Sequence, residues 1–196
     1  SMDFDGRGEK YQPGTCASCH GGRPAKLNPD GSYPNNGNIG AGFLPWDVST
    51  FYFSDTDFDQ QSHTVGPDAA QSESCRRFNE MVLLTNPSSA VNELVHGLYG
   101  STDLTSTTLP AGATFNSNFI PAGWLPGNAG GPAADKAADA AKLYLQVVGP
   151  YCRACHAQRT DNTNINFASY SAFLSFAAEG VESIPDLVFD RGVMPL

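Results

Sequence analysis

The sequence has few basic residues and no long hydrophobic run. Its 196 residues include 11 Lys and Arg against 20 Asp and Glu, which gives a formal net charge of −9. Because such a chain repels polyanions, we expect neither nucleic acid nor an anionic membrane surface as a partner. No apolar run approaches the ~20 residues of a membrane-spanning helix, so we also expect no membrane span in this chain.

Common catalytic motifs are missing as well. No Ser-His-Asp set, phosphate-binding loop or paired-carboxylate motif stands out in the sequence. Cysteine, histidine and methionine are scarce, with 5, 4 and 3 copies respectively. These few residues therefore carry most of the information about chemistry.

All but one of the cysteines, and two of the histidines, fall into two C-x-x-C-H motifs. The motifs consist of Cys16, Cys19 and His20 in the first copy and Cys152, Cys155 and His156 in the second. This pattern attaches a c-type haem. The two thiols form thioether bonds to the porphyrin vinyl groups, and the adjacent imidazole binds the iron from the same side. We therefore predict two covalently bound haem c groups as cofactors, with His20 and His156 as iron ligands.

Other uses of these cysteines explain the motifs less well. A zinc ribbon places its two C-x-x-C knuckles about 15–20 residues apart, whereas these motifs begin at residues 16 and 152. A thioredoxin-like pair needs a βαβ pattern beside it, and neither copy has one. Disulfides within the motifs would leave both histidines unexplained. The fifth cysteine, Cys75, is expected to be a small buried apolar residue.

Hydrophobic periodicity predicts an all-α fold with long irregular loops. Helices are expected over residues 71–85, 88–99, 133–148 and 167–179, and Gly149-Pro150 is expected to end the third of them. The expected inward faces are Cys75, Phe78 and Val82; Val91, Leu94, Val95 and Leu98; Ala134, Ala138, Ala141, Leu145 and Val148; and Phe167, Tyr170, Leu174 and Ala177. The aromatic residues between 100 and 132 predict an ordered crossing rather than a flexible linker.

The two motifs resemble those of the c-type cytochromes, specifically a dihaem member with class I-like segments. The second motif follows a helix, as it does in class I proteins. The resemblance implies cytochrome c-like helices with long irregular loops around two covalent haems. Residues 1–125 would form the first haem unit and residues 126–196 the second, packed together as one compact body.

The resemblance also suggests sixth iron ligands. Met194, next to Pro195, matches the Met-Pro loop of class I cytochromes and is predicted to ligate the second haem. For the first haem we prefer His63, which lies in a loop just before a helix, with Met81 as the runner-up. His96 is expected on the exposed polar face of its helix. An iron with an open sixth position is the remaining option.

The resulting hypothesis is an electron carrier rather than an enzyme. Since covalent haem attachment happens outside the bacterial cytoplasm, the resemblance implies a periplasmic or extracellular protein. Its partners would be redox proteins, and the acidic surface suits a basic docking patch on such a partner. Two alternatives stay open: a dihaem peroxidase-like enzyme with one open iron, and a haem sensor or electron-donor module of a larger secreted protein, for example one that feeds a copper oxygenase.

Overall fold

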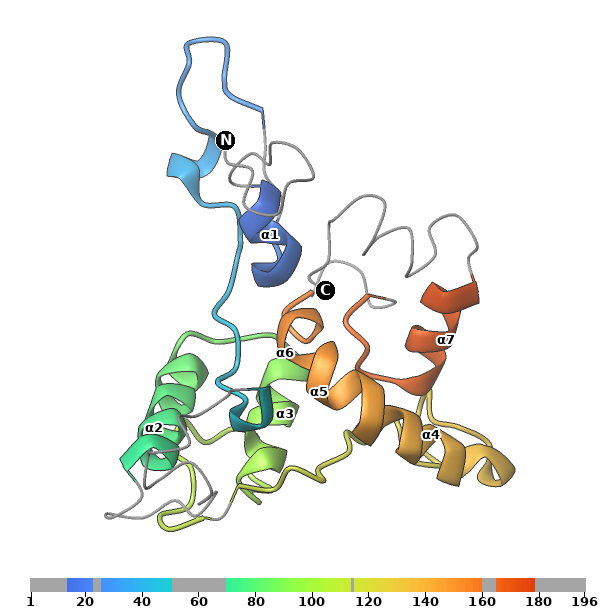
Figure 1. Ribbon diagram of the computed structural model, residues 1–196. Coiled ribbons are helices and arrows are strands. Elements are labelled where there is room, and N and C mark those ends of the chain that lie inside the picture. The colour runs from blue at the N-terminus through green and yellow to red at the C-terminus, as the bar shows by residue number, and fades with distance from the viewer. Residues whose placement is uncertain (1–13, 23–25, 51–69, 114, 160–164, 179–196) are drawn as a thin grey trace, which may run out of the picture.

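A computed structural model describes residues 14–22, 26–50, 70–113, 115–159 and 165–178 (Figure 1). Within these ranges the protein is helical and contains no strand, which confirms the all-α prediction for this part of the chain. An isolated parallel bridge joins Gly123 to Ser169. The elements are α1 (Gly14–His20), η1 (Pro34–Gly37), η2 (Val48–Thr50), α2 (Ala70–Leu84), α3 (Ser89–Leu98), η3 (Ala134–Lys136), α4 (Ala137–Leu143), η4 (Tyr144–Val148), α5 (Gly149–Tyr151), α6 (Arg153–His156) and α7 (Tyr170–Ala178).

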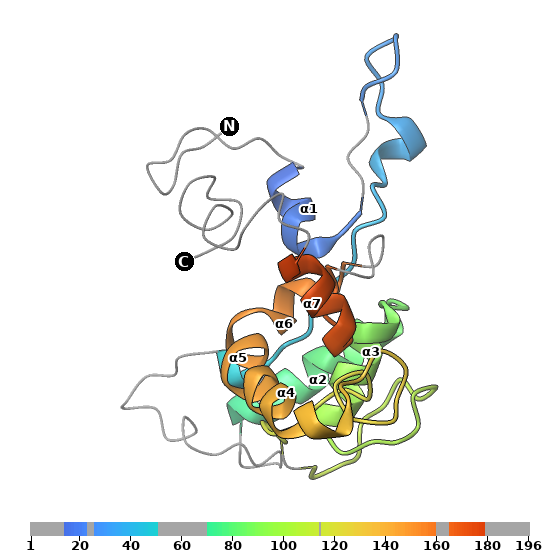
Figure 2. The same ribbon diagram turned by 90° about the vertical axis from the view of Figure 1, so that its right-hand side faces the viewer.

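The described helices pack around two hydrophobic clusters. α2 and α3 lie on one side of the molecule, α4 and α7 on the other, and α5 and α6 between them (Figures 1 and 2). The first cluster consists of Val48, Cys75, Val82, Leu83, Val91, Leu94, Val95, Leu98, Tyr99, Leu109, Phe115 and Ala157. The second consists of Trp124, Ala140, Tyr144, Val148, Phe167 and Phe173. The proposed boundary at residue 125 stays a prediction, although Trp124 packs in the second cluster.

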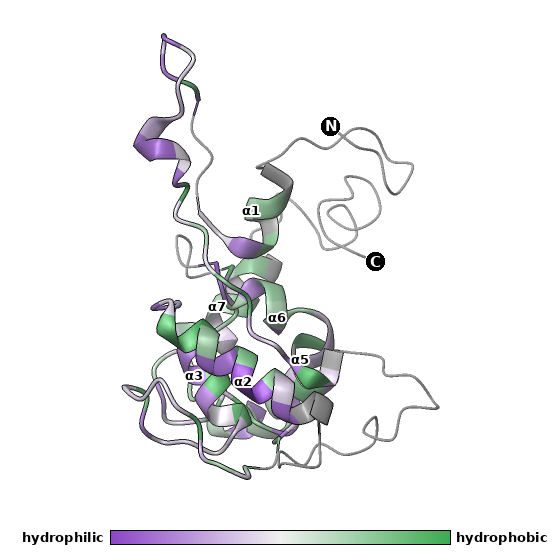
Figure 3. Cartoon of the chain, turned by 90° about the vertical axis from the view of Figure 1, so that its left-hand side faces the viewer, coloured by the Kyte–Doolittle hydropathy of each residue, from purple (hydrophilic) through white to green (hydrophobic). Residues whose placement is uncertain are grey.

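Not every described segment packs on these clusters. Residues 26–38 are mostly exposed and extend away from the helices, and η1 within them is strongly hydrophilic (Figure 3). Among the described residues, none of the helices combines the length and the apolar character needed to cross a membrane. The aromatic residues of the crossing between α3 and α4 are anchored as expected, because Phe115 and Trp124 are both buried.

Helix α3 follows its sequence pattern closely. The Ser88 hydroxyl accepts a hydrogen bond from the Val91 N–H at 3.1 Å, which caps the helix. The same hydroxyl donates to the Ala157 carbonyl at 2.7 Å and so joins α3 to the end of α6. The expected stripe is confirmed, since Val91, Leu94, Val95 and Leu98 are all buried.

The expected exposure of His96 is wrong. Its side chain is 0% exposed. Nδ1 lies 2.8 Å from the Asn92 carbonyl oxygen of its own helix, and Nε2 lies 3.1 Å from the Ser106 carbonyl oxygen in the following loop. The loop therefore folds back over the polar face of α3 and encloses the imidazole with backbone acceptors.

The inward faces of the other helices differ from expectation. In α2, Cys75 and Val82 are buried as expected, but Phe78 is 42% exposed, and Asn79 is buried because its amide pairs with both backbone groups of Trp46. In α7, Phe173 is buried and Leu174 is exposed. In the helix that begins at residue 134, the buried side chains are Ala140, Tyr144 and Val148; of the expected stripe only Val148 is buried.

Gly149 and Pro150 do not end the helix as expected. The segment η4 is π-helical, and the Gly149 N–H reaches back five residues to the Tyr144 carbonyl. The wider turn accommodates Pro150, which has no N–H to donate, within the first residues of α5. The helical path breaks at Cys152, whose φ is −123°. The second motif therefore starts at this break.

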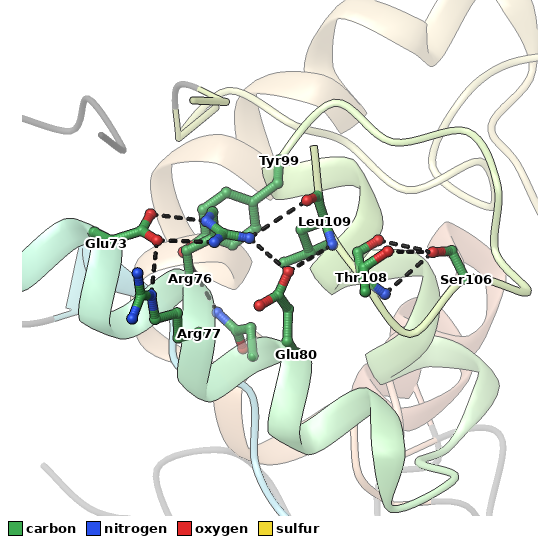
Figure 4. A network of polar contacts seen from close by, with 9 residues as sticks. Glu73, Arg76, Arg77, Glu80, Tyr99, Ser106, Thr108 and Leu109 are labelled. Atoms are coloured by element: carbon green, nitrogen blue, oxygen red, sulfur yellow. Dashed lines mark hydrogen bonds and ion pairs between the residues drawn. The ribbon is translucent and has the colours of Figure 1, made fainter. Parts of the chain in front are cut away.

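A buried arginine connects α2 to the loop after α3 (Figure 4). Arg76 Nε and Nη2 each donate to a carboxylate oxygen of Glu73 at 2.8 Å, and Nη1 donates to Glu80 at 2.5 Å. The same oxygen of Glu80 accepts the Leu109 N–H at 2.9 Å. Hydrogen bonding by Arg76 lowers the pKa of Glu73 to about 2.

We predict that Glu73→Gln reduces the acid sensitivity of folding. Because the folded pKa of Glu73 is depressed, its contribution to stability is complete above the unfolded value of about 4.3 and disappears as the pH falls towards 2. After allowance for solvent screening, the contribution is roughly 1–2 kcal/mol. Urea unfolding of wild type and variant at neutral and acid pH measures the difference. Arg77→Met removes the weaker, exposed partner and should retain most of the pH dependence; identical acid profiles for wild type and Glu73→Gln would contradict the assignment.

Candidate functional site

The two C-x-x-C-H motifs are brought together by the fold. The first forms most of α1, and the second begins at Cys152 and continues through α6. α1 packs against α6 in space although the two are far apart in sequence (Figures 1 and 2). In both motifs the histidine is the last residue of a short helix. The cysteines lie on the turn before it.

His20 is held by the backbone of one residue. Its Nδ1 donates to the Gly42 carbonyl at 2.9 Å, and the Gly42 N–H donates to the His20 carbonyl at 2.9 Å. A Cβ at Gly42 would lie 2.0 Å from Gln158 Nε2, so a side chain there would require the end of Gln158 to move. Gly42, which positions His20, therefore also packs against Gln158, which lies just after the second motif.

His156 is held in a different environment. Its Nδ1 donates to the Ile165 carbonyl at 2.5 Å. The ring of Phe167 stacks on the imidazole, with centroids 4.0 Å apart and planes 9° apart, and Phe176 contacts it edge-on at 6.5 Å. Burial lowers the pKa of His156, which favours the neutral imidazole that a metal ion requires.

Phe167 adopts an uncommon backbone conformation to make this contact. Its φ is +52°, in the left-handed region that a bulky residue seldom occupies. The indole N–H of the buried Trp124 donates to the Phe167 carbonyl at 2.8 Å, and the Asn166 side chain accepts the Ala168 N–H at 3.0 Å. These bonds hold the strained residue in place on both sides, a pattern associated with functional sites.

The hydrogen bonds determine which ring nitrogen of each motif histidine is available. A carbonyl oxygen can only accept, so Nδ1 of both His20 and His156 must carry the proton. In the neutral form this leaves a lone pair on Nε2. Metal-ligating histidines use this arrangement, in which the second nitrogen donates to a backbone carbonyl or a carboxylate. The stack of Phe167 on the ring face does not occupy the in-plane lone pair.

All four motif cysteines are free thiols, and two of them meet across the motifs. The Cys155 thiol donates a hydrogen bond to Cys19, which lowers the pKa of Cys19 to about 6 and raises the pKa of Cys155. Burial raises the pKa of Cys152. The remaining cysteine, Cys75, is buried in the first hydrophobic cluster, as expected from the sequence.

Inside the second motif, Arg153 forms a buried ion pair with Asp47. Arg153 Nε lies 2.5 Å from Asp47 Oδ2, and Nη2 lies 3.1 Å from Oδ1. The two residues are 106 positions apart in sequence, and their side chains are almost fully buried. Nη2 also donates to the Ser49 hydroxyl at 3.1 Å. The segment after the first motif is thereby fixed to the second motif.

The structure leaves the sixth ligands as predictions. Met194 and His63 lie outside the described residues. Met81, the runner-up, is 61% exposed on α2, and α2 lies apart from α1 in both views (Figures 1 and 2). Within the described ranges, no three His, Cys, Asp or Glu side chains are grouped closely enough to hold a metal ion.

Several residues that shape the site are not evident from the sequence motifs. Gly42 and Ile165 act through their carbonyl groups, which any residue could supply, so no sequence signal identifies them. Asp47 and Arg153 stand out in the sequence as charged residues beside apolar ones. The sequence does not show that the two residues pair with each other. Phe167 was expected inside a helix, and its position before α7 depends on the bond from Trp124.

Comparisons of the chain with protein-family models, curated proteins and solved structures gave no match.

We predict that His20 and His156 both carry the proton on Nδ1 in the haem-free protein. Side-chain nitrogen NMR distinguishes this tautomer from the Nε2–H form. Gly42→Ala should disturb His20 rather than His156, because its new Cβ meets the Gln158 side chain beside the carbonyl that accepts from His20. An Nε2–H signal for either histidine in the wild type would show that its bond to the carbonyl is absent.

We predict that Asp47→Asn destabilises the protein by about 3–5 kcal/mol, because Arg153 keeps a buried charge without a counterion. Urea unfolding measures the loss. The double variant Asp47→Asn/Arg153→Met removes both charges and should recover much of it. A single variant as stable as the wild type, or a double variant less stable than the single, would exclude a buried and coupled pair.

Proposed function

We propose that this chain is a dihaem c-type cytochrome that carries electrons outside the cytoplasm. The observation that supports the proposal best is the shared state of the two motif histidines. Each donates Nδ1–H to a backbone carbonyl and keeps its Nε2 lone pair, although the acceptors lie 22 and 9 residues away from their histidines. A histidine that only stabilises the fold can place both ring nitrogens on backbone carbonyls, as His96 does, whereas an iron ligand requires one nitrogen lone pair to stay available.

The residues present fit two such cofactors. The haem groups supply one-electron chemistry when bound. Cys16 and Cys19 would hold the first through thioether bonds and Cys152 and Cys155 the second, which agrees with the absence of disulfides among these four thiols. His20 and His156 would each contribute Nε2 to the metal.

The surrounding side chains have a positioning role in this proposal. The Gly42 and Ile165 carbonyls set the orientation of the two imidazoles about their Nδ1–H bonds. Phe167 and Phe176 exclude water from His156 and restrict its rotation. We retain Met194 as the proposed sixth ligand of the second haem, and His63, with Met81 as runner-up, for the first.

The remaining expectations belong to the same proposal. The protein would act as a carrier between redox proteins rather than as an enzyme, in the periplasm or outside a bacterial cell. Its net charge of −9 suits a partner with a basic docking surface. The cytochrome c-like arrangement of helices around two haems is likewise proposed, in two units that pack together.

We predict that protein matured with a cytochrome c assembly system carries two haems. Mass spectrometry should show both additions after acid–acetone extraction, because thioether bonds survive it. Cys152→Ala/Cys155→Ala should carry one haem. Cys75→Ala is the matched control and should carry two, since Cys75 lies in the first hydrophobic cluster. A wild-type protein with one haem, with none or with bound zinc would refute the proposal.

A further inference from the structure

Gln158 lies just after the second motif and contacts the first. It is 5% exposed. Its backbone carbonyl oxygen would lie 2.7 Å from a Cβ at Gly21, the residue that follows His20. The neighbouring Arg159 donates from Nη1 to the Ala17 carbonyl at 3.1 Å, in the middle of the first motif. The backbone of Gln158 is therefore held against the end of the first motif.

The side-chain amide of Gln158 lies across the residue that positions the first histidine. A Cβ at Gly42 would lie 2.7 Å from Cδ and 3.3 Å from Oε1 of this amide. Gly42 in turn exchanges two hydrogen bonds with His20, since its carbonyl accepts from Nδ1 and its N–H donates to the His20 carbonyl. Gln158 thus reaches the surroundings of His20 twice, through its backbone at Gly21 and through its side chain at Gly42.

The Oε1 oxygen of Gln158 is buried and has no hydrogen-bond partner among the described residues. An unpaired buried amide oxygen lowers the folding equilibrium constant by about tenfold or more. Folded proteins therefore pair nearly all such atoms, with the chain or with a bound molecule. The described part of the chain leaves this amide without the partner that its burial calls for.

A haem attached at the first motif would supply such a partner. The porphyrin of haem c carries carboxylate groups, which accept hydrogen bonds. A primary amide has N–H donors at one end and an acceptor at the other, and rotation about its last side-chain bond exchanges the two ends. We propose that the Gln158 amide binds a carboxylate group of the first haem, with its N–H groups as donors. This inference rests on the proposed function.

The contact would make the first haem depend on a residue that the second motif places. It would also affect the reduction potential of the first haem. Without the amide donor, the negative charge of the haem carboxylate is compensated less, which favours the more positive, oxidised iron. Hydrogen bonding around a haem is one of the means by which a protein sets its potential. Loss of the Gln158 amide should therefore lower the potential of the first haem.

The test compares the effect of Gln158→Leu on urea unfolding of the full chain with and without haem. Thioether-bound haem stays on the unfolded chain, so both transitions report folding. In the haem-free chain the substitution removes an unpaired polar group at similar volume, so the folding equilibrium constant should stay equal or rise. In the haem-loaded chain it removes a hydrogen bond to a charged group, so the constant should fall about tenfold.

Potentiometric titration of the loaded protein gives a readout that a purely structural role would not move. Gln158→Leu should lower the potential of the first haem and leave that of the second unchanged. Cys16→Ala/Cys19→Ala lacks the first haem and so identifies which potential belongs to which site. Gln158→Ala repeats the unfolding comparison with a smaller side chain, and its loss should be about tenfold greater in the loaded chain than in the haem-free chain.

Asn92→Leu is the matched control. Asn92 Oδ1, on α3, is the other buried side-chain oxygen without a partner among the described residues. Its replacement should change the unfolding of both forms equally. Equal changes in both forms for Gln158→Leu, a strongly destabilised haem-free variant, or an unchanged potential of the first haem would overturn the inference alone. A wild-type chain that gains no haem would refute the proposed function, and this inference with it.

Discussion

The buried ion pair between Asp47 and Arg153 determines how the segment after the first motif meets the second motif. Removing two charges from water is costly, and the cost is recovered only where both groups are paired closely and their remaining valences are satisfied. Here Asp47 also accepts both the N–H and the hydroxyl of Ser49. The pair therefore admits very few relative positions of η2 and α6, and the other contacts between the motifs form within that limit.

The two motif histidines share one hydrogen-bonding pattern in unlike surroundings. His20 is hydrogen-bonded to the backbone of Gly42, whereas His156 stacks on Phe167, whose carbonyl accepts a hydrogen bond from the buried Trp124. The hydrophobic shell and the hydrogen bonds around a ligand tune the metal that it binds. In the proposed cytochrome, such a difference would favour two distinct reduction potentials and hence a preferred direction of electron flow within one chain.

The sequence predicted where the helices lie better than which of their faces are buried. The aliphatic stripe of α3 is buried as expected, because four branched side chains at helical spacing have no better place than a core. On α2, Cys75 and Val82 are buried as expected, but Phe78 is exposed and Asn79 is buried by its bonds to Trp46, and no hydrophobic pattern reports a bond of that kind. At the candidate site, the motif identifies the thiols and imidazoles, but the carbonyl acceptors depend on the folded backbone alone.

The π-helical segment η4 has a consequence for the tolerance of this region to insertions and deletions. A π-turn holds one residue more than an α-turn over nearly the same rotation, so loss of a single residue from Tyr144–Val148 would leave the residues beyond it in nearly the same direction. Its cost would be local, because a regular α-turn there brings the ring of Pro150 against the preceding turn. Loss of a residue from the regular helix α4 would instead rotate every residue beyond by about 100° and shift it by about 1.5 Å along the axis. Arg153 would then leave Asp47, so a change of length is tolerated in η4 but not in the helix before it.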